Sequence, residues 1–205
     1  MYIQNAKAEI RKRWKALIGL PLYHIKNQSM AVTDSLIKLP EFKKSRSISV
    51  YLSMVYGEIS TDEIIKRSHQ MGKKIYVPYV DGSEMFMFRL YSTEDPSTFV
   101  KNKWGIPQPS KSYAKGIREE AMDKDGLDLI IIPGVAFDRN LNRLGHGKGY
   151  YDKYLSKIKD WSEKNNLNAP AKVGVALKEQ LVDFVPTDSL DVKLDILLVQ
   201  NEIIR

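Results

Sequence analysis

The sequence of 205 residues contains no cysteine. This absence excludes disulfide bonds, zinc sites made of thiolates and catalysis by a cysteine nucleophile. The sequence also has no apolar run approaching the roughly 18 residues of a membrane span. Its opening stretch, MYIQNAKAEIRKRWKAL, is charged where a signal peptide would be apolar. We therefore expect a cytoplasmic protein with no membrane segment.

The balance of charge is basic, with 32 Lys and Arg residues against 25 Asp and Glu residues and a formal net charge of +7. Such a balance favours an anionic partner: a nucleotide, an acidic metabolite, a nucleic acid or an anionic membrane. Charge alone does not choose among them. Hydrophobic residues make up 43% of the chain, which is enough for one buried core. We find no internal repeat, and we expect a single domain over residues 1–205.

Helix-like and strand-like segments alternate along the chain. Apolar residues recur with a period of about 3.6 over residues 5–18, and further helices are predicted at 28–38, at 62–70 and from near Gly149 onward. Strands are predicted at 48–54, 73–80, 85–91, 127–134, 172–177 and 194–200. Residues 91–126 are rich in turn formers and predict surface loops. The alternation predicts an α/β fold, a three-layer sandwich with a mostly parallel central sheet flanked by helices.

The stretch GHGKGYYD, residues 145–152, follows the most apolar run of the chain, LDLIIIPG at 127–134. In parallel sheets, ligands bind beyond the carboxyl ends of the strands. A glycine-rich turn that enters a helix exposes backbone N–H groups to phosphate oxygens. Arg143 and Lys148 add positive charge to this turn, and the carboxylate of Asp152 is suited to Mg²⁺. The stretch therefore favours phosphate binding.

The turn does not match the standard phosphate-binding motifs. GxxxxGK[ST] fails because Asn142 stands where the first glycine is needed and Gly149 follows Lys148, and GxGxxG fails because the spacing is GxGxG. A structural alternative therefore stays open. In it the glycines only allow a bend, Asp152 stabilises the positive end of the following helix, and two tyrosines pack in the core.

At greater length, the stretch PGVAFDRNLNRLGHGKGYYDKYL, residues 133–155, resembles the signature of the 5-formyltetrahydrofolate cyclo-ligase family, also called methenyltetrahydrofolate synthetases. Further pieces match in the same order: Lys7-x-x-x-Arg11, YLSMVYGEISTDEII at 51–65, WGIPQPS at 104–110 and LDVKLDILL at 190–198. The resemblance implies an α/β sandwich, usually monomeric. It also implies the ATP- and Mg²⁺-dependent cyclisation of 5-formyltetrahydrofolate to 5,10-methenyltetrahydrofolate, with ADP and phosphate released.

The resemblance also implies roles for individual residues. Those matching the family's ATP contacts are Lys7, Arg11, Arg143, Gly145, His146, Gly147, Lys148, Gly149, Tyr150 and Tyr151. Glu58 matches the folate-binding glutamate, with Met54 and Trp104 lining the pterin pocket and Tyr150 placed where nucleotide and folate meet. Arg143, Lys148 and Tyr150 are the candidate catalytic residues, and the first two are expected to be loop residues facing ligand.

Two aspartates, Asp152 and Asp191, match the family's metal-binding aspartates. The chain departs from the pattern at one point, because many relatives have His-Asp where this sequence has Leu190-Asp191. Any role of that histidine is absent here. The excess of positive charge suits a polyglutamylated folate, although scattered lysines commonly serve solubility.

The same side chains have ordinary structural interpretations. Lys7 and Arg11 fit a solvated helix face, Glu58 fits a surface carboxylate, Trp104 fits packing under the proline-rich loop, and Asp191 fits a turn cap. His24, His69 and His146 lack metal-ligand spacing and are expected at the surface.

Two other functions also remain open. A small-molecule kinase or sugar-phosphate enzyme would use a similar glycine loop. A basic nucleic-acid-binding domain would share the net charge, although the lysines are dispersed along the chain and no recognised nucleic-acid module appears. We expect no nucleic-acid partner.

Overall fold

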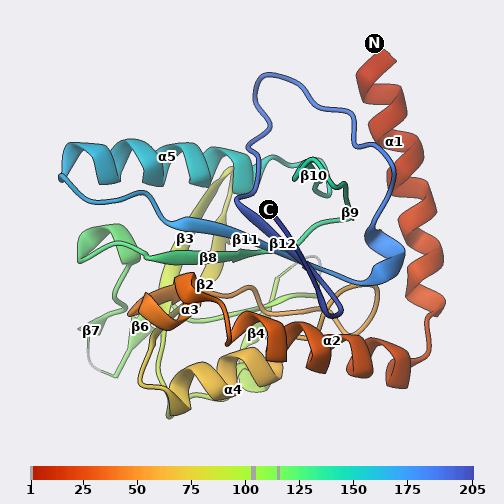
Figure 1. The fold of residues 1–205 in the computed structure, drawn as a ribbon. Helices are drawn as coiled ribbons and strands as arrows, with labels where there is room; N and C mark the ends of the chain where they lie inside the picture. The colour runs from red at the N-terminus through yellow and green to blue at the C-terminus, as the bar shows by residue number, and fades with distance from the viewer. Residues whose placement is uncertain (1, 103–104, 115) are drawn as a thin grey trace.

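Helices and strands alternate along the chain (Figure 1). The structure, a computed structural model, describes residues 2–102, 105–114 and 116–205. Its α-helices are α1 (Tyr2–Trp14), α2 (Leu22–Leu36), α3 (Pro40–Lys44), α4 (Asp62–Gln70) and α5 (Tyr150–Lys164). Short 3₁₀ helices are η1 (Lys15–Gly19), η2 (Pro96–Thr98), η3 (Ala121–Asp123) and η4 (Lys178–Gln180).

Within the described residues, seven strands form one main sheet. In spatial order they are β13 (Glu202–Ile204), β12 (Ile196–Val199), β11 (Ala171–Ala176), β8 (Leu129–Ile132), β1 (Ser47–Ser49), β2 (Lys74–Asp81) and β3 (Glu84–Leu90). The five strands from β12 to β2 are parallel to one another, whereas β13 and β3 are antiparallel edges. The predicted mostly parallel sheet is confirmed.

The sheet is covered on both faces, because successive side chains of a strand point to opposite sides. In β8, Leu129 and Ile131 pack with the cluster that contains residues of α2, α3 and α4. Ile130 and Ile132 pack with residues of α5. Figure 1 shows α5 above the sheet and α2 and α4 below it. The three layers predicted from the sequence are therefore present.

The order of the parallel strands predicts a ligand-binding region, which we call the crevice, at one end of the sheet. Read as β2-β1-β8-β11-β12, it is a doubly wound order in which the chain leaves β1 through α4 on one face and leaves β8 through α5 on the other. Ligands bind in such folds outside the carboxyl ends of the two strands where the order reverses. Residues 50–61, after β1, and 133–149, after β8, lie there, and both segments contain predicted site residues.

Several elements differ from the sequence prediction. The predicted strand 48–54 ends at Ser49, and the predicted helix 28–38 begins at Leu22 and ends at Leu36. The helical period was obscured because Ser29 and Thr33 are buried polar residues on the inner face of α2. Their hydroxyls donate to the carbonyl groups four residues earlier. α3 and β13 were not predicted.

The described part of the surface loops predicted over residues 91–126 contains very short elements. These are η2, η3 and the two-residue strands β4 (Val100–Lys101), β5 (Pro107–Gln108), β6 (Ser112–Tyr113) and β7 (Gly116–Ile117). The pair β9 (Ala136–Phe137) and β10 (Arg143–Leu144) forms a further small antiparallel ladder just before the glycine loop.

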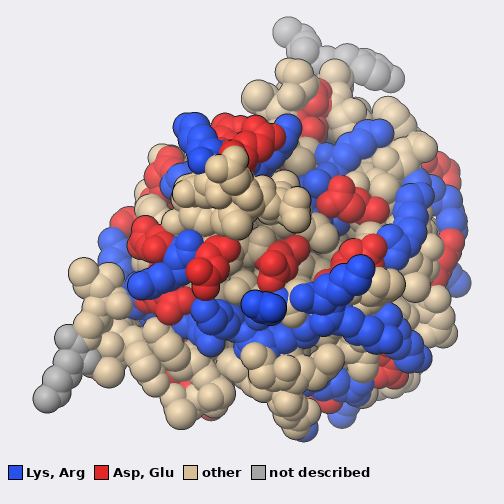
Figure 2. All heavy atoms as spheres, turned by 60° about the vertical axis from the view of Figure 1, so that its left-hand side comes forward, with Lys and Arg blue, Asp and Glu red and all other residues tan. Residues whose placement is uncertain are grey.

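Charge is dispersed over the molecule. On the face drawn in Figure 2, Lys and Arg side chains form a band, and Asp and Glu side chains lie within and beside it. Surface ion pairs join opposite charges, as between Lys111 and Asp81 at 2.7 Å. No helix among the described residues combines the length and the apolar character that crossing a bilayer requires.

Candidate active site

The glycine loop enters α5 as predicted. Gly149 is the N-cap residue with a positive φ of 67°, and α5 begins at Tyr150. Gly147 has a φ of 95°, and a Cβ atom built on it would lie 3.2 Å from Cζ of Arg11. A Cβ atom on Gly145 would lie 2.8 Å from Nη1 of Arg143. Two of the three glycines therefore let guanidinium groups pack directly against the loop backbone.

Arg143 is not the loop residue that the sequence predicted. It belongs to β10, its side chain is only 3% exposed, and Nη2 donates to Oδ1 of Asp152 at 2.9 Å. The guanidinium carbon also lies 5.7 Å from the centre of the Tyr151 ring. The alternation of a two-residue strand was hidden in the sequence by the turn formers around it. Arg143 thus has a structural partner as well as a place beside the glycine loop.

Helix α1 connects the two sides of the crevice. Lys7, Arg11 and Trp14 occupy one face of the helix, as residues spaced by about one turn do. Nε of Arg11 donates to the carbonyl of Gly145 at 2.9 Å. Nε1 of Trp14 donates to the carbonyl of Gly57 at 3.0 Å, in the segment after β1. The face predicted as either solvated or phosphate-binding is therefore directed at the site.

Lys7 is almost fully buried and paired with two carboxylates. Its Nζ donates to Oδ2 of Asp188 at 2.8 Å and to Oδ2 of Asp191 at 2.6 Å. Burial lowers the pKa of the ammonium, but the hydrogen bonds to Asp188 and Asp191 outweigh this effect and leave the pKa above its ordinary value. Asp191 also caps a turn, because its Oδ2 accepts the N–H of Asp188 at 2.7 Å.

The two predicted metal ligands, Asp152 and Asp191, are both neighbours of Val192. Oδ1 of Asp152, in the first turn of α5, accepts the N–H of Val192 at 3.3 Å, and Asp191 immediately precedes that residue. Among the described residues, no group of three or more His, Cys, Asp or Glu is placed to hold a metal ion. Mg²⁺ commonly binds through one or two carboxylates together with substrate phosphates. The two aspartates fit that mode of binding.

Glu58 is buried at the carboxyl end of β1. Its Oε1 accepts the N–H of Met54 at 2.6 Å, and the residue is 6% exposed. Burial raises the pKa of Glu58 to about 8, and the hydrogen bond from Met54 offsets only part of that shift. Burial also raises the pKa of Tyr151, and the nearby Glu58 raises it further. Glu58 is thus not the ordinary surface carboxylate of the alternative interpretation.

Glu58 lies near Tyr151, because its charge raises the pKa of the Tyr151 hydroxyl. After burial, the charges of Glu58 and Tyr151 also raise the pKa of the buried Tyr51. The hydroxyl of Tyr151 is buried and has no hydrogen-bond partner among the described residues. A buried polar group without a partner is costly, and sites where a ligand binds are a common reason for one. The predicted folate residue and the predicted nucleotide loop are therefore brought together.

The remaining loop residues differ in exposure. Lys148 is exposed, and Tyr150 is half-buried with its hydroxyl donating to the carbonyl of Gly82 at 3.0 Å. His146 packs edge-on against Trp14, with ring centres 4.7 Å apart. Partial burial, followed by the nearby Arg11 and Arg143, lowers the pKa of its imidazole. Lys148 is therefore the loop cation that is most available to solvent.

Trp104, predicted to line the pterin pocket, lies outside the described residues. The segment that follows it is attached to the sheet, because Oε1 of Gln108 accepts the N–H of Val80 at 2.9 Å. The N–H of Ile106 donates to Oδ1 of Asn102 at 3.1 Å. The position of Trp104 as a folate contact stays a prediction.

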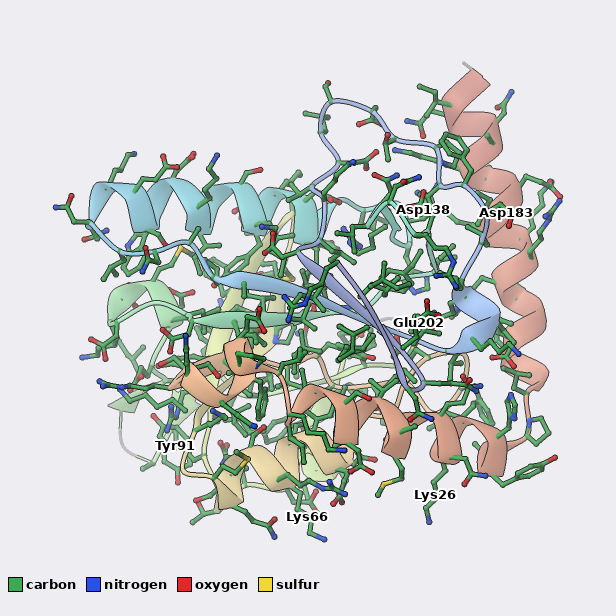
Figure 3. All side chains as sticks on the ribbon, viewed as in Figure 1. Lys26, Lys66, Tyr91, Asp138, Asp183 and Glu202 are labelled. Carbon is green, nitrogen blue, oxygen red and sulfur yellow. The ribbon has the colours of Figure 1, made fainter. Side chains whose placement is uncertain are left out.

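Asp138 was not singled out from the sequence, although it lies within the quoted motif. It is fully buried near the turn from β9 to β10 (Figure 3) and accepts N–H groups of Asn140, Asn142 and Val185. These hydrogen bonds fix the approach to the glycine loop and join it to the 182–188 segment. An aspartate between an apolar strand and two asparagines is the signal that predicts such a turn.

A cavity of about 790 Å³ forms a groove along α1. It contains none of the residues predicted for the site and is lined mainly by apolar side chains, among them Ile10, Leu17 and Phe184. Neither Glu58 nor any residue of the glycine loop lines it. We therefore place the candidate active site in the crevice.

Comparison with known proteins decides the family. The model of the 5-formyltetrahydrofolate cyclo-ligase family matches residues 3–200. The chain belongs to the 5-formyltetrahydrofolate cyclo-ligase family. It is 36% identical to the Schizosaccharomyces pombe protein named "Probable 5-formyltetrahydrofolate cyclo-ligase", covering 97% of each chain. It is also 36% identical to the Mus musculus 5-formyltetrahydrofolate cyclo-ligase, covering 97% of this chain and 93% of the relative.

A solved structure agrees with this cyclo-ligase assignment. The NMR structure of Aquifex aeolicus 5,10-methenyltetrahydrofolate synthetase superposes with a TM-score of 0.76 at 32% identity and covers 97% of this chain and 92% of that chain. The α/β fold of this cyclo-ligase family member is thereby shown, and the protein is an enzyme of the ligase class.

Replacing Gly147 by alanine tests the packing of Arg11 on the loop. The added methyl group meets both a strained backbone conformation and the guanidinium group. With the ATP-binding role that the sequence predicts for this loop, we expect affinity for ATP to fall by about tenfold or more. Gly149→Ala is the matched control. It has a positive φ but no heavy atom within 4 Å of the added Cβ, so only the backbone strain applies. Calorimetric titration with ATP compares the two, and equal affinities would contradict the role given to the Arg11 contact.

Proposed function

We propose that the protein catalyses the ATP- and Mg²⁺-dependent cyclisation of 5-formyltetrahydrofolate to 5,10-methenyltetrahydrofolate. The observation that supports this most directly is the convergence of a buried carboxyl group, Glu58, with a glycine loop that packs against Arg11 and Arg143. Family membership supplies the substrate class, and the site supplies groups suited to both a pterin and a phosphate. We further propose a monomeric, cytoplasmic enzyme that accepts polyglutamylated folates.

The chemistry explains why a nucleotide is needed. The N5-formyl group is an amide, and donation from nitrogen makes its carbonyl carbon a poor electrophile. Transfer of the terminal phosphoryl group of ATP to the formyl oxygen releases ADP and leaves an iminium-like carbon bearing a phosphate leaving group. N10 attacks that carbon, and phosphate departs with the former formyl oxygen. The N10 proton is lost, and the methenyl cation is formed.

Catalysis of this reaction mainly requires the protein to position the two substrates and to stabilise the phosphoryl charge. Lys148, Arg11 and Arg143 are the cations beside the glycine loop, and the backbone N–H groups at the start of α5 add donors for phosphate oxygens. No protein nucleophile is required. Asp152 and Asp191 would hold Mg²⁺, which would supply positive charge that neutralises the phosphoryl group.

Glu58 serves the folate side of the site. Because its pKa is raised to about 8, the Glu58 carboxyl group is neutral in most molecules at pH 7. A neutral carboxyl group offers one O–H donor and one acceptor, a pair that matches the mixed donor and acceptor edge of a pterin. Met54 contacts this carboxyl group, Tyr150 follows the glycine loop, and Trp104 is proposed to complete the pocket.

The direct test is a spectrophotometric assay with 5-formyltetrahydrofolate, ATP and Mg²⁺. We expect the strongly absorbing methenyl product to accumulate only when all three are present. Turnover of ATP with a sugar or another small acceptor, and no product with the folate, would favour a kinase instead. Tight, salt-sensitive binding of DNA or RNA without folate turnover would favour a nucleic-acid-binding domain.

Lys148→Ala is expected to lower turnover by about 100-fold or more, because it removes a charge placed on the phosphate loop. Its thermal melting temperature should stay unchanged, since the side chain is exposed. Lys153→Ala, another exposed lysine one turn into α5, is the control and should keep the wild-type rate. Near wild-type turnover of Lys148→Ala would remove Lys148 from the catalytic set.

Glu58→Ala is expected to weaken binding of 5-formyltetrahydrofolate more than binding of ATP. The change removes the only donor and acceptor that we assign to the pterin edge and leaves the glycine loop intact. Separate calorimetric titrations with each ligand measure the two effects. A larger loss of ATP affinity would place Glu58 on the nucleotide side.

A further inference from the structure

We propose that, in the protein without nucleotide, the Lys7 ammonium holds a position between two carboxylates that a divalent cation takes when the nucleotide binds, and that Asp188 belongs to this cation site. The identity of the cation as Mg²⁺ rests on the proposed function. The geometry of the exchange rests on Lys7, Asp188 and Asp191 alone.

The ammonium is placed as a metal ion would be. It lies 2.8 Å from Oδ2 of Asp188 and 2.6 Å from Oδ2 of Asp191, so two carboxylate oxygens converge on one positive centre. The Lys7 side chain is 5% exposed, whereas those of Asp188 and Asp191 are 32% and 21% exposed. The carboxylates are therefore reachable from solvent on a side that Lys7 does not cover.

The two carboxylates are also held independently of Lys7. Oδ2 of Asp191 accepts the N–H of Asp188 at 2.7 Å, and Oδ1 of Asp188 accepts the N–H of Leu190 at 3.0 Å. The turn over residues 188–191 thus fixes both side chains through its own backbone. Release of the ammonium leaves two carboxylates whose like charges disfavour each other, and another cation at that point would relieve this repulsion.

An adjoining cavity gives an independent indication of a ligand. It measures about 140 Å³, and its polar lining consists of Asp188, Asp191, Asn142 and Thr187 with the basic residues Arg143 and Lys193. Asn142 is 7% exposed, and its buried Oδ1 has no hydrogen-bond partner among the described residues. Oxygen atoms of two carboxylates and one amide are the ligands that Mg²⁺ prefers, and the volume accommodates an ion with bound water.

The same cavity carries an unused donor. Nε of Arg143 is buried and has no hydrogen-bond partner among the described residues, so a phosphate oxygen there would satisfy it. Asn142 and Arg143 both line the cavity, and an acceptor and a donor without partners suit a cation that arrives together with a phosphate. Lys7 would then exchange carboxylates for phosphate, which reconciles its pairing here with its predicted contact to ATP.

The exchange predicts how metal binding depends on Lys7. A divalent ion alone must displace a tethered ammonium whose effective concentration is high, so the wild-type protein should bind it weakly without nucleotide. Removing the ammonium should expose the carboxylate pair to the ion. We therefore expect Lys7→Met and Lys7→Gln to bind Mn²⁺ about tenfold or more tightly than the wild type.

The experiment is a titration of Mn²⁺, followed by its electron paramagnetic resonance signal, into the full chain without nucleotide or folate. Lys12→Met is the matched control, because it removes one exposed lysine from the same helix and should leave Mn²⁺ binding unchanged. Adding Asp188→Asn to Lys7→Gln should abolish the gain. Lys7→Gln keeps an N–H donor beside the aspartates, so it remains informative where Lys7→Met does not fold.

Folded Lys7→Gln that binds Mn²⁺ no better than wild type would overturn the proposal. So would a gain that survives Asp188→Asn, because the ion would then lie elsewhere. Neither result depends on turnover, so the cyclisation assay can succeed while this inference fails. Likewise, the expected Mn²⁺ binding can be observed while the cyclisation assay gives no product.

Discussion

Arg143→Met is expected to lower the free energy of unfolding by about 3 kcal/mol and turnover by about 100-fold. The stability loss follows from the ion pair with Asp152, in which the Arg143 side chain is 3% exposed and the Asp152 side chain 20% exposed. Methionine fills much of the volume but leaves the carboxylate without its cation. The loss of turnover follows from the missing guanidinium group beside the glycine loop. Urea unfolding and the folate assay measure the two effects separately.

Two further variants separate the structural from the catalytic share of this effect. Arg139→Met breaks an ion pair with Glu202 in which both side chains are about half exposed, so we expect a loss of at most about 1 kcal/mol. The double change Arg143→Met with Asp152→Asn removes both charges and should recover part of the stability but none of the turnover. Recovery of turnover in the double variant would show that Arg143 acts only through Asp152.

The residues of the site were easier to predict from the sequence than their contacts. The continuous apolar run of β8 and the glycine at the start of α5 are local signals, and the structure confirms them. Arg143 was misplaced because a strand of two residues has no pattern of its own. Its burial comes from Asp152, nine positions away.

Long-range pairing explains the other gaps. Nothing near Lys7 in the sequence indicates that residues 188–191 lie against it, and nothing near Trp14 indicates the carbonyl of Gly57. Helix α1 presents a basic residue to an acidic turn only because the fold brings the loop that precedes β12 against it. Such contacts depend on topology, which local periodicity does not encode.

Glu58 gives the second large effect, which appears in the dependence of stability on pH. Its pKa is about 8 in the folded protein, against an ordinary value near 4.3 in the unfolded chain. At pH values between these two pKa values, Glu58 keeps its proton in the folded protein and has lost it in the unfolded chain. The stability that Glu58 contributes is fully present below about pH 4 and is lost as pH rises through 8. Because one pKa unit corresponds to about 1.4 kcal/mol, the full shift corresponds to at most about 5 kcal/mol.

Glu58→Gln keeps an oxygen acceptor for the Met54 N–H but cannot ionise. We expect its free energy of unfolding to match the wild type near pH 5 and to exceed it by about 2 to 5 kcal/mol at pH 9, where the wild type must bury a carboxylate. Glu84→Gln, at an exposed position of β3, is the control and should follow the wild-type curve at every pH. Urea unfolding at pH 5, 7 and 9 measures this difference. If the free energies of unfolding of wild type and Glu58→Gln change with pH in parallel, Glu58 is ionised in the folded protein. The neutral O–H donor that we assign to the pterin edge would then not exist.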